Sequence, residues 1–154
     1  MKFKIRKPDI DHRTAIMSML DRLADFDIPA GRKPEEFFDH DAKLVSRYFE
    51  GDAPESEILI ACDIKGVVIG VLVLSQNLDP LNNQVNTHIE VLDVARLYER
   101  KGIGSALLEK AEQLALAQGS LAVSLNVFRN NRKARRFYQL HNFDEELIRC
   151  IKRF

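Results

Sequence analysis

The chain of 154 residues carries 23 basic and 23 acidic side chains, so its formal net charge is zero. This balance argues against the basic surface of nucleic-acid-binding proteins and gives no attraction to an anionic membrane. A hydrophobic fraction of 45% and a charged fraction of 30% are typical of a globular domain with a sizeable core. We therefore expect one domain over residues 1–154, with neither a nucleic acid nor a membrane as partner.

Neither a membrane span nor a secretory signal is predicted. The segment Met1–Pro8 is basic but lacks the apolar core of a signal peptide. No apolar run approaches the roughly 20 residues of a spanning helix. The two cysteines, Cys62 and Cys150, lie in apolar, strand-like contexts without metal-ligand spacing, so both are expected to be buried free thiols. These features predict a cytoplasmic protein without a metal site.

The N-terminal third predicts one strand and two helices. Apolar and basic residues alternate over 3–6, which indicates a short strand with one buried face. Apolar residues then recur at helical spacing over 9–24, and Asp9 or Asp11 can cap this helix. A second helix is expected over 34–49, with proline at its first position and acids in its first turn.

The rest of the chain predicts five more strands and two more helices. Residues 57–63 and 67–75 form a hairpin signal around Gly66, and the second run is apolar on both faces, so it should be central. Antiparallel hairpins followed by a strand–helix–strand crossover predict a mixed α+β sheet. The remaining strands are expected at 87–95, 121–127 and 143–154, and the helices at 102–118 and 131–141.

Two glycines lie where the strand 87–95 gives way to the following helix. At a helix N-terminus the first N–H groups lack intrahelical partners, and the dipole is positive. Gly102 and Gly104 remove the Cβ atoms that would keep a phosphate away from those groups. Arg100 and Lys101 add two cations. The pattern predicts a phosphate or pyrophosphate site, with a tight turn or a close helix–sheet contact as the structural alternative.

Two segments resemble motifs of the GNAT family of N-acetyltransferases, which transfer an acetyl group from acetyl-CoA to an amine. Val94 is followed, after seven residues, by Gly102-Ile103-Gly104, as in the first motif. Residues 131–143 are similar to the family pattern Asn-x-x-Ala-x-x-Phe-Tyr-x-x-x-Gly-Phe, with Asn142 in place of the glycine. The expected element order is also the family's. The resemblance implies a GNAT-like fold with a mixed, mostly antiparallel sheet of about six or seven strands and about four flanking helices.

The resemblance also implies which residues bind acetyl-CoA. Main-chain groups of Leu92 and Val94 would pair with the pantetheine arm as an added strand, and the Val94 N–H would polarise the thioester carbonyl. Asn131 would hydrogen-bond the same arm; a plain helix cap is its alternative role, and the two can coexist. Backbone N–H groups at the glycine-rich turn would hold the pyrophosphate, from Arg100, Lys101, Gly102, Ile103, Gly104 and Ser105.

Three residues are candidates for catalysis. The Tyr138 phenol, with an ordinary pKa near ~10, could protonate or hydrogen-bond the departing thiolate; a core aromatic is the alternative. Glu90 and His88 lie two apart in a predicted strand, hence on one face, and either could take the proton of the amine directly or through a water. In the resemblance, Glu90 fits the pattern of small-amine acetyltransferases, whereas His88 lies nearer the acid of the histone-modifying branch.

Glu99 departs from the family pattern, which has Gln or Arg three residues before the first glycine. A carboxylate there would repel a pyrophosphate, so we expect Glu99 to point outward and Arg100 or Lys101 to compensate. An acidic run around the first helix–helix connection borders the acceptor site in this family. It could attract a cationic amine or be an ordinary solvated run. Its members are Asp25, Asp27, Glu35, Glu36, Asp39 and Asp41.

Together these features predict an N-acetyltransferase that works by direct attack in a ternary complex, because the motifs place no covalent nucleophile. The expected acceptor is a primary amine of a small molecule. A protein N-terminus or lysine is the enzymatic alternative, and a non-catalytic acyl-CoA-binding module is the alternative from another class. Binding alone would need neither Tyr138 nor a base. The resemblance suggests a homodimer.

Overall fold

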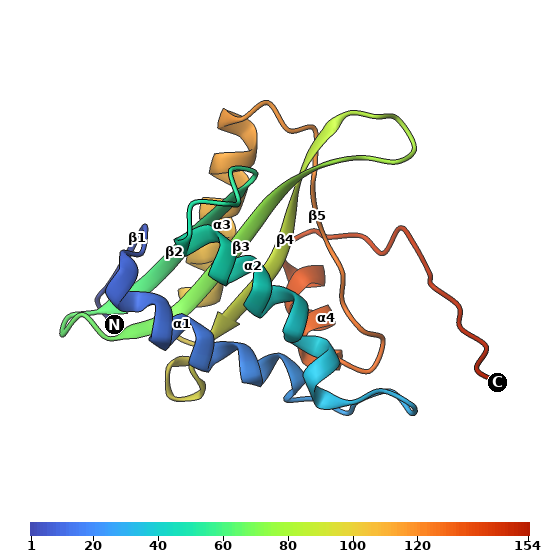
Figure 1. The fold of residues 1–154 in the computed structure, drawn as a ribbon, viewed down its shortest axis with the longest axis horizontal. Coiled ribbons are helices and arrows are strands. Elements are labelled where there is room, and N and C mark those ends of the chain that lie inside the picture. The colour runs from blue at the N-terminus through green and yellow to red at the C-terminus, as the bar shows by residue number, and fades with distance from the viewer.

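Five strands form one sheet in the order β1-β2-β3-β4-β5 (Figure 1). The structure is a computed structural model that describes residues 1–154. The first four strands are antiparallel, and β5 runs parallel to β4, so the mixed α+β architecture is confirmed. The sheet has five strands instead of the six or seven expected. They are β1 (Phe3–Arg6), β2 (Ser56–Asp63), β3 (Val68–Leu78), β4 (Val85–Val94) and β5 (Val123–Leu125).

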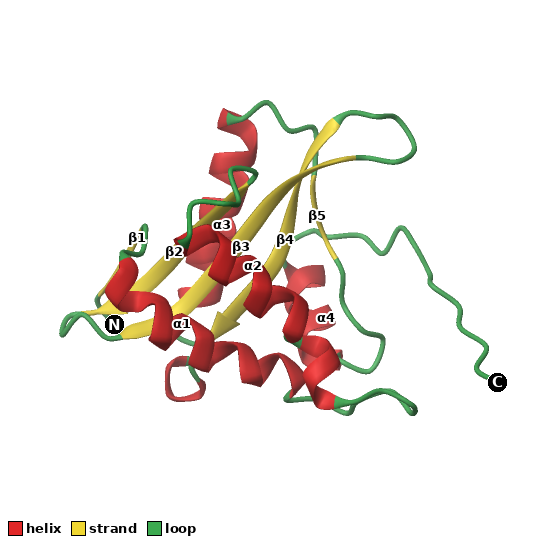
Figure 2. Ribbon diagram, in the orientation of Figure 1, coloured by secondary structure: helices red, strands yellow, loops and turns green.

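Helices cover both faces of the sheet (Figure 2). The helices α1 (Arg13–Leu20) and α2 (Asp39–Phe49) lie on one face, and α3 (Ile103–Ala117) lies on the other. The fourth helix, α4 (Arg132–Leu140), follows β5. Asp9, not Asp11, is the first cap, because its carboxylate accepts the Asp11 N–H at 3.1 Å. None of these helices combines the length and the apolar character needed to cross a membrane.

The strand β3 is buried on both faces, as its continuous apolar run predicts. Val71 and Val73 pack against α1 and α2, while Ile69 and Leu72 pack against α3. Gly70 permits the close approach of α3, because a Cβ there would lie 3.0 Å from the Leu107 side chain. The sheet thus separates two apolar layers, and β4 lies between them.

The prediction of a last strand over residues 143–154 is wrong. Residues 144–154 are exposed, adopt no regular structure and run away from the sheet (red in Figure 1). Strand 121–127 is also shorter than expected, since only Val123–Leu125 pair with β4. A segment of alternating apolar residues forms a strand only when a neighbouring strand pairs with it. Because β5 is short, residues 144–154 have no such neighbour. One consequence is that Cys150 is exposed, contrary to expectation, whereas Cys62 is buried; both are free thiols.

Candidate active site

The strand β4 carries a β-bulge at Glu90. The register pairs Val73 with Val91 and Leu74 with Ile89, which leaves Glu90 opposite no residue of β3. A bulge inserts one residue and bends the strand. Ile89 therefore packs in the α3 layer, whereas Val91 packs in the layer beneath α1 and α2. The extra residue at this bend is one of the two predicted bases.

Beyond the bulge, the outer edge of β4 is free. The strand β5 pairs only with residues 87–89, so residues 90–94 face no strand on the side away from β3. The Ala95 N–H bonds to the Ile69 carbonyl at 2.9 Å, and hydrogen-bonded pairs alternate along an antiparallel ladder. The main-chain groups of Val94 and Leu92 consequently point outward, where an extended, amide-bearing arm can add as a strand. The Val94 carbonyl is already engaged by the Arg22 guanidinium.

The glycine-rich turn leads from this edge into α3. Gly102 is the residue before the helix and has a φ of +82°, a left-handed conformation that favours glycine. The first hydrogen bond at this end joins the Ala106 N–H to the Gly102 carbonyl at 3.0 Å, so the N–H groups of residues 103–105 have no partner within the helix. A Cβ on Gly104 would lie 3.5 Å from the Phe137 ring, an ordinary contact. Open N–H groups at a dipole-positive helix end fit a pyrophosphate.

Glu99 pairs with two cations that are distant in sequence, Arg22 and Lys133, and not with the neighbouring Arg100 or Lys101. Lys133 lies 2.6 Å and Arg22 lies 3.0 Å from its carboxylate. The hydrogen bond from Lys133, followed by that from Arg22, holds the pKa of Glu99 below its usual value. Its side chain is 23% exposed and therefore does not point freely outward. Lys101 instead donates to a backbone carbonyl at 2.7 Å.

Arg22 is a functional candidate that the sequence did not indicate. It lies in a short turn after α1, and its guanidinium is 3.5 Å from the Asp93 carboxylate as well as bonded to Glu99. Burial raises the pKa of Asp93 to about 6, and Arg22 only partly opposes that shift. This ion network joins the end of α1, β4, the glycine-rich turn and α4. Since Arg22 is 77 residues from Glu99, no local pattern could reveal the pair.

Tyr138 is packed as a core aromatic, and its catalytic role stays a prediction. Its ring packs between Phe137 and Phe143, with centroid distances of 5.3 Å and 5.5 Å. Its hydroxyl has no hydrogen-bond partner in the chain, and burial raises the pKa of Tyr138 to about 12. At neutral pH the phenol therefore keeps its proton and remains a free donor.

Asn131 and Ser105 already make bonds within the protein. The Asn131 carboxamide oxygen accepts the Ala134 N–H at 3.1 Å, which confirms its cap role; its cofactor role stays a prediction. The Ser105 hydroxyl lies 2.9 Å from Nε2 of His141, whose Nδ1 lies 2.8 Å from the Phe137 carbonyl. Because a carbonyl only accepts, Nδ1 donates to it, and in the neutral ring Nε2 accepts a hydrogen bond from the Ser105 hydroxyl. His141, which the sequence motifs do not mark, thus links α3 to α4.

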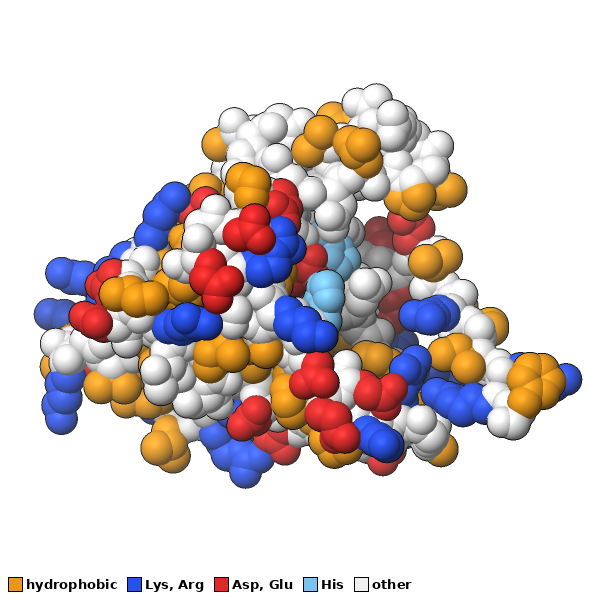
Figure 3. All heavy atoms as spheres, in the orientation of Figure 1, with side chains coloured by type: hydrophobic (Ala, Val, Ile, Leu, Met, Phe, Trp, Pro, Cys, Tyr) orange, Lys and Arg blue, Asp and Glu red, His pale blue; other side chains and the backbone are white.

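His88 and Glu90 lie on one side of β4, as predicted, but have different partners. Nδ1 of His88 is 2.9 Å from the Ser124 hydroxyl of β5. Glu90 accepts a hydrogen bond from the Ser75 hydroxyl of β3. Histidine side chains gather in a hollow on this face, between the β3–β4 hairpin and the C-terminal segment, with acidic side chains below it (Figure 3).

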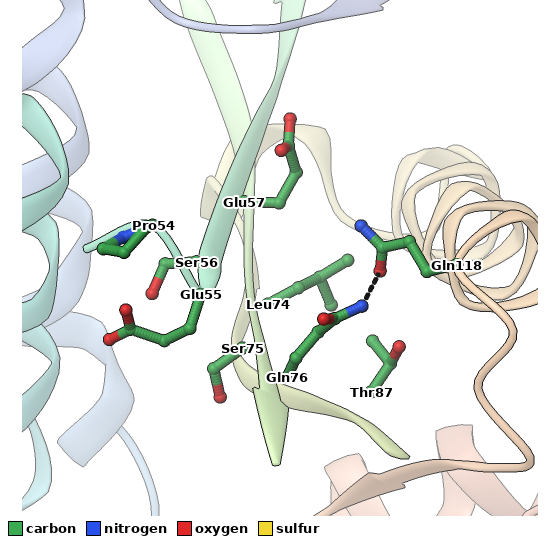
Figure 4. Close-up of a pocket in the computed structure, with 9 residues that line it drawn as sticks. All are labelled: Pro54, Glu55, Ser56, Glu57, Leu74, Ser75, Gln76, Thr87 and Gln118. Carbon is green, nitrogen blue, oxygen red and sulfur yellow. Dashed lines mark hydrogen bonds between the residues drawn. The ribbon is translucent and has the colours of Figure 1, made fainter. Parts of the chain in front are cut away.

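A separate polar cavity at the far end of α3 is not a substrate site. Gln76 and Gln118, which both line this cavity, are joined by a hydrogen bond of 2.8 Å (Figure 4). Its volume of about 60 Å³ has room for only a few water molecules. None of the predicted binding or catalytic residues lines it. The lining residues are Pro54, Glu55, Ser56, Glu57, Leu74, Ser75, Gln76, Thr87 and Gln118.

Comparison with known proteins agrees with this geometry. The Acetyltransferase (GNAT) family model matches residues 19–143. A comparison with curated proteins gave no match. Among solved structures, the chain is similar to a Pyrococcus furiosus protein described provisionally as an acetyl transferase. The TM-score is 0.80 and the identity 19%, over 99% of this chain and 100% of that chain.

Two further structures are similar at comparable identity. Glucosamine-6-phosphate N-acetyltransferase from Arabidopsis thaliana has a TM-score of 0.68 and 22% identity, over 100% of this chain and 99% of that chain. Ribosomal-protein-alanine N-acetyltransferase from Brucella melitensis biovar Abortus 2308 has a TM-score of 0.72 and 16% identity, over 99% and 100%. These likenesses show the fold, and the family model covers most of the sequence. The chain belongs to the GNAT family of acetyl-CoA-dependent N-acetyltransferases.

Proposed function

We propose that this chain, as a single domain, transfers the acetyl group of acetyl-CoA to a primary amine of a small molecule by direct attack in a ternary complex. The observation that carries the proposal is the continuity of the free outer edge of β4 with the open N-terminus of α3. The edge of β4 can bind an amide-bearing arm, and the adjacent N-terminus of α3 can bind a pyrophosphate. The bulge at Glu90 adds a base at the same edge.

The residues of this edge fit acetyl-CoA, which supplies an activated acyl group and a thiolate leaving group. Outward main-chain groups of Leu92 and Val94 would pair with the pantetheine arm. The N–H groups of residues 100–105 would face the pyrophosphate, and the exposed side chain of Arg100, which makes no ion pair, adds positive charge. With Glu99 neutralised by Lys133 and Arg22, its carboxylate no longer argues against an anion at this site.

Protein groups would take the first proton of the ammonium group and stabilise the charges that develop, while the second proton of the nitrogen passes to the departing thiolate. Glu90, or His88 as the second candidate, would take a proton from the ammonium group and free the nitrogen lone pair for attack. The Val94 N–H would polarise the carbonyl as the C–N bond forms and the C–S bond breaks. The Tyr138 hydroxyl would hydrogen-bond the departing sulfur. With a pKa of about 12 it is a weaker acid than a thiol of pKa about 8.5, so it acts mainly as a hydrogen-bond donor.

A small-molecule acceptor fits the place of Glu90. Its side chain is half-buried between β3 and the start of α2, which favours a slender amine over a lysine on a folded surface. A protein N-terminus or lysine is the alternative. Of the three similar structures named above, one is a glucosamine-6-phosphate N-acetyltransferase and one a ribosomal-protein-alanine N-acetyltransferase. The proposal also places the enzyme in the cytoplasm and makes it a homodimer.

Calorimetric titration with acetyl-CoA tests the donor site. We expect one-to-one micromolar binding to the wild type and a loss of at least about 100-fold in Gly104→Glu, because the new carboxylate would enter the phosphate site. Gly104→Ala controls for folding, since its methyl group would make only ordinary contact with Phe137. Gln113→Glu adds the same charge on the exposed side of α3 and should bind normally. No binding by the wild type at millimolar acetyl-CoA would reject the proposal.

A further inference from the structure

His141 lies directly after α4 and caps the C-terminal end of this helix. Its N–H bonds to the Tyr138 carbonyl at 3.0 Å, and its ring Nδ1 lies 2.8 Å from the Phe137 carbonyl. The last carbonyls of a helix lack N–H partners within the helix, and a histidine side chain can supply one. Because Nδ1 is used in this way, Nε2 is the ring nitrogen that is left for another element.

This second nitrogen reaches the first turn of α3. Nε2 of His141 is 2.9 Å from the Ser105 hydroxyl, although the two residues are 36 positions apart in the sequence. The His141 ring also packs on the Phe137 ring, with centroids 4.4 Å apart, and the Phe137 ring lies beside Gly104. One hydrogen bond and one packing contact thus hold two consecutive residues of α3, Gly104 and Ser105, against the end of α4.

The two residues held in this way carry N–H groups of the expected phosphate site. The first hydrogen bond of α3 starts at the Ala106 N–H, so the N–H groups of Gly104 and Ser105 have no partner within the helix. The terminal turns of helices fray when nothing else holds them. Because α4 holds this turn through His141, its N–H groups keep one orientation before an anion arrives.

We propose that His141 is a positioning residue for the phosphate-binding turn. Through its hydrogen bond to Ser105, it fixes the N–H groups that would bind the pyrophosphate of the donor. This inference rests on the proposed acetyltransferase function and adds a residue that does not touch the donor. Groups that are ordered before binding spare the ligand the entropic cost of ordering them, so His141 increases donor affinity. It takes no part in the acetyl transfer itself.

Kinetics with two acetyl donors test this role. S-Acetylpantetheine has the thioester and the amide-bearing arm of acetyl-CoA but lacks the pyrophosphate and the nucleotide. With n-butylamine as acceptor, His141→Ala should raise the KM for acetyl-CoA by about 5- to 10-fold, as the loss of one hydrogen bond predicts, and leave kcat within about twofold. Both constants for S-acetylpantetheine should stay within about twofold of the wild-type values. An equal loss with the two donors would show a general structural role and overturn the inference.

A double-mutant cycle shows whether His141 acts through Ser105. Ser105→Ala removes the hydrogen bond, keeps the cap of α4 and places a good helix former at an exposed position of α3, so it should fold. It should raise the KM for acetyl-CoA as much as His141→Ala does, and the double variant should be no worse than either single variant. Gln139→Ala, at an exposed position in the last turn of α4, is the matched control and should change nothing. Additive losses in the double variant would show that the two residues act independently and would overturn the proposal.

Calorimetry with CoA needs no turnover and separates this inference from the proposed function. CoA should bind the wild type and Gln139→Ala equally, and His141→Ala and Ser105→Ala about 5- to 10-fold more weakly. Equal binding by all four proteins would reject the role of His141 and leave the acetyltransferase function intact. The expected weakening, in a protein that acetylates no amine, would reject the acetyltransferase function alone. Failure of the wild type to bind CoA would reject both.

Discussion

At the scale of single residues, the buried ionisable groups cluster around the bulged strand. Burial raises the pKa of Asp41 and of Asp93 to about 6, and that of Tyr138 to about 12. Asp93 has the Arg22 guanidinium 3.5 Å away, whereas Asp41 has no cation. Ionisable groups with shifted pKa values are common at sites where charge or protons are handled. The unpaired Asp41 carboxylate costs stability when it is ionised.

Replacing Asp41 by asparagine should therefore stabilise the empty protein at neutral pH. The folded pKa of about 6 exceeds the ordinary 3.8, so the folded state binds the proton more tightly and stability falls as pH rises from about 4 to above 6. Ionisation costs up to about 3 kcal/mol. Asp41→Asn should unfold with nearly wild-type free energy at pH 4 and gain up to that amount above pH 7, measured by urea denaturation. The free energy of unfolding of Asp39→Asn should depend on pH as that of the wild type does. The same pH dependence in Asp41→Asn would refute the explanation.

The Tyr138 hydroxyl should affect turnover and not binding. Tyr138→Phe keeps the ring between Phe137 and Phe143, so the affinity for acetyl-CoA should stay within about twofold. Loss of the hydrogen bond to the leaving sulfur should lower kcat by about 100-fold, measured as thiol release with butylamine. Tyr48→Phe, on α2, is the matched control and should keep full activity. Unchanged kcat in Tyr138→Phe would leave the residue with a packing role only.

At the scale of elements, one ion network positions the parts of the site. Arg22, after α1, bonds to Asp93 and Glu99, and Lys133 of α4 bonds to Glu99 from the other side. The network therefore ties β4 and the glycine-rich turn to elements that are distant in sequence. Its loss would expose the phosphate site to the negative charge of Glu99.

Arg22→Gln should weaken both folding and donor binding. Asp93 would lose its cation in a buried place, which should cost about 3 kcal/mol in the free energy of unfolding. Glu99 would be only half neutralised, so acetyl-CoA should bind several-fold more weakly in calorimetry. The double variant Arg22→Gln/Glu99→Gln should regain the affinity but not the stability, because Asp93 stays unpaired. Arg47→Gln, an exposed control on α2, should change neither. If the second substitution does not restore affinity, the electrostatic explanation fails.

The sequence predicted the elements up to residue 142 but not the contacts between them. Periodicity and glycine placement located α3 and the glycine-rich turn before it. Asn142, which stands in place of the glycine of the family pattern, has a left-handed conformation with a φ of 62°. Strict alternation puts Ile89 and Val91 on one face, yet the bulge sends them to opposite faces, and no residue pattern announces it. The ion pair of Arg22 and the closeness of Asp41 to Glu90 depend on tertiary packing, which local patterns do not carry.

At the scale of the whole molecule, residues 144–154 carry apolar side chains that nothing covers. Leu147 is 87% and Ile148 is 84% exposed, which is unusual for an apolar segment of a monomer. The outer edge of β5 has no strand beside it, and a groove of about 410 Å³ adjoins it. Residues of α3, β5 and the chain after α4 line this groove: Glu112, Val123, His141, Asn142, Phe143 and Asp144. In the proposed homodimer, the segment of one copy can cover the β5 edge of the other.

Removal of residues 144–154 should therefore change association more than folding. Within one copy these residues are exposed, and they contact the rest of the chain through the Arg135–Glu145 ion pair at 2.6 Å and through the Arg153 side chain beside Gly31. The free energy of unfolding should therefore change by less than about 1 kcal/mol. Light scattering should give twice the 17.7 kDa chain mass for the full sequence and a single chain mass for the shortened one. Leu147→Asp should weaken the dimer without shortening the chain, because it would bury a charge at an apolar contact.

Acetyl-CoA should bind the shortened chain normally, since none of its expected contacts lies beyond residue 138. A monomeric full-length chain would remove the homodimer, and a shortened chain that stays dimeric would move the interface elsewhere.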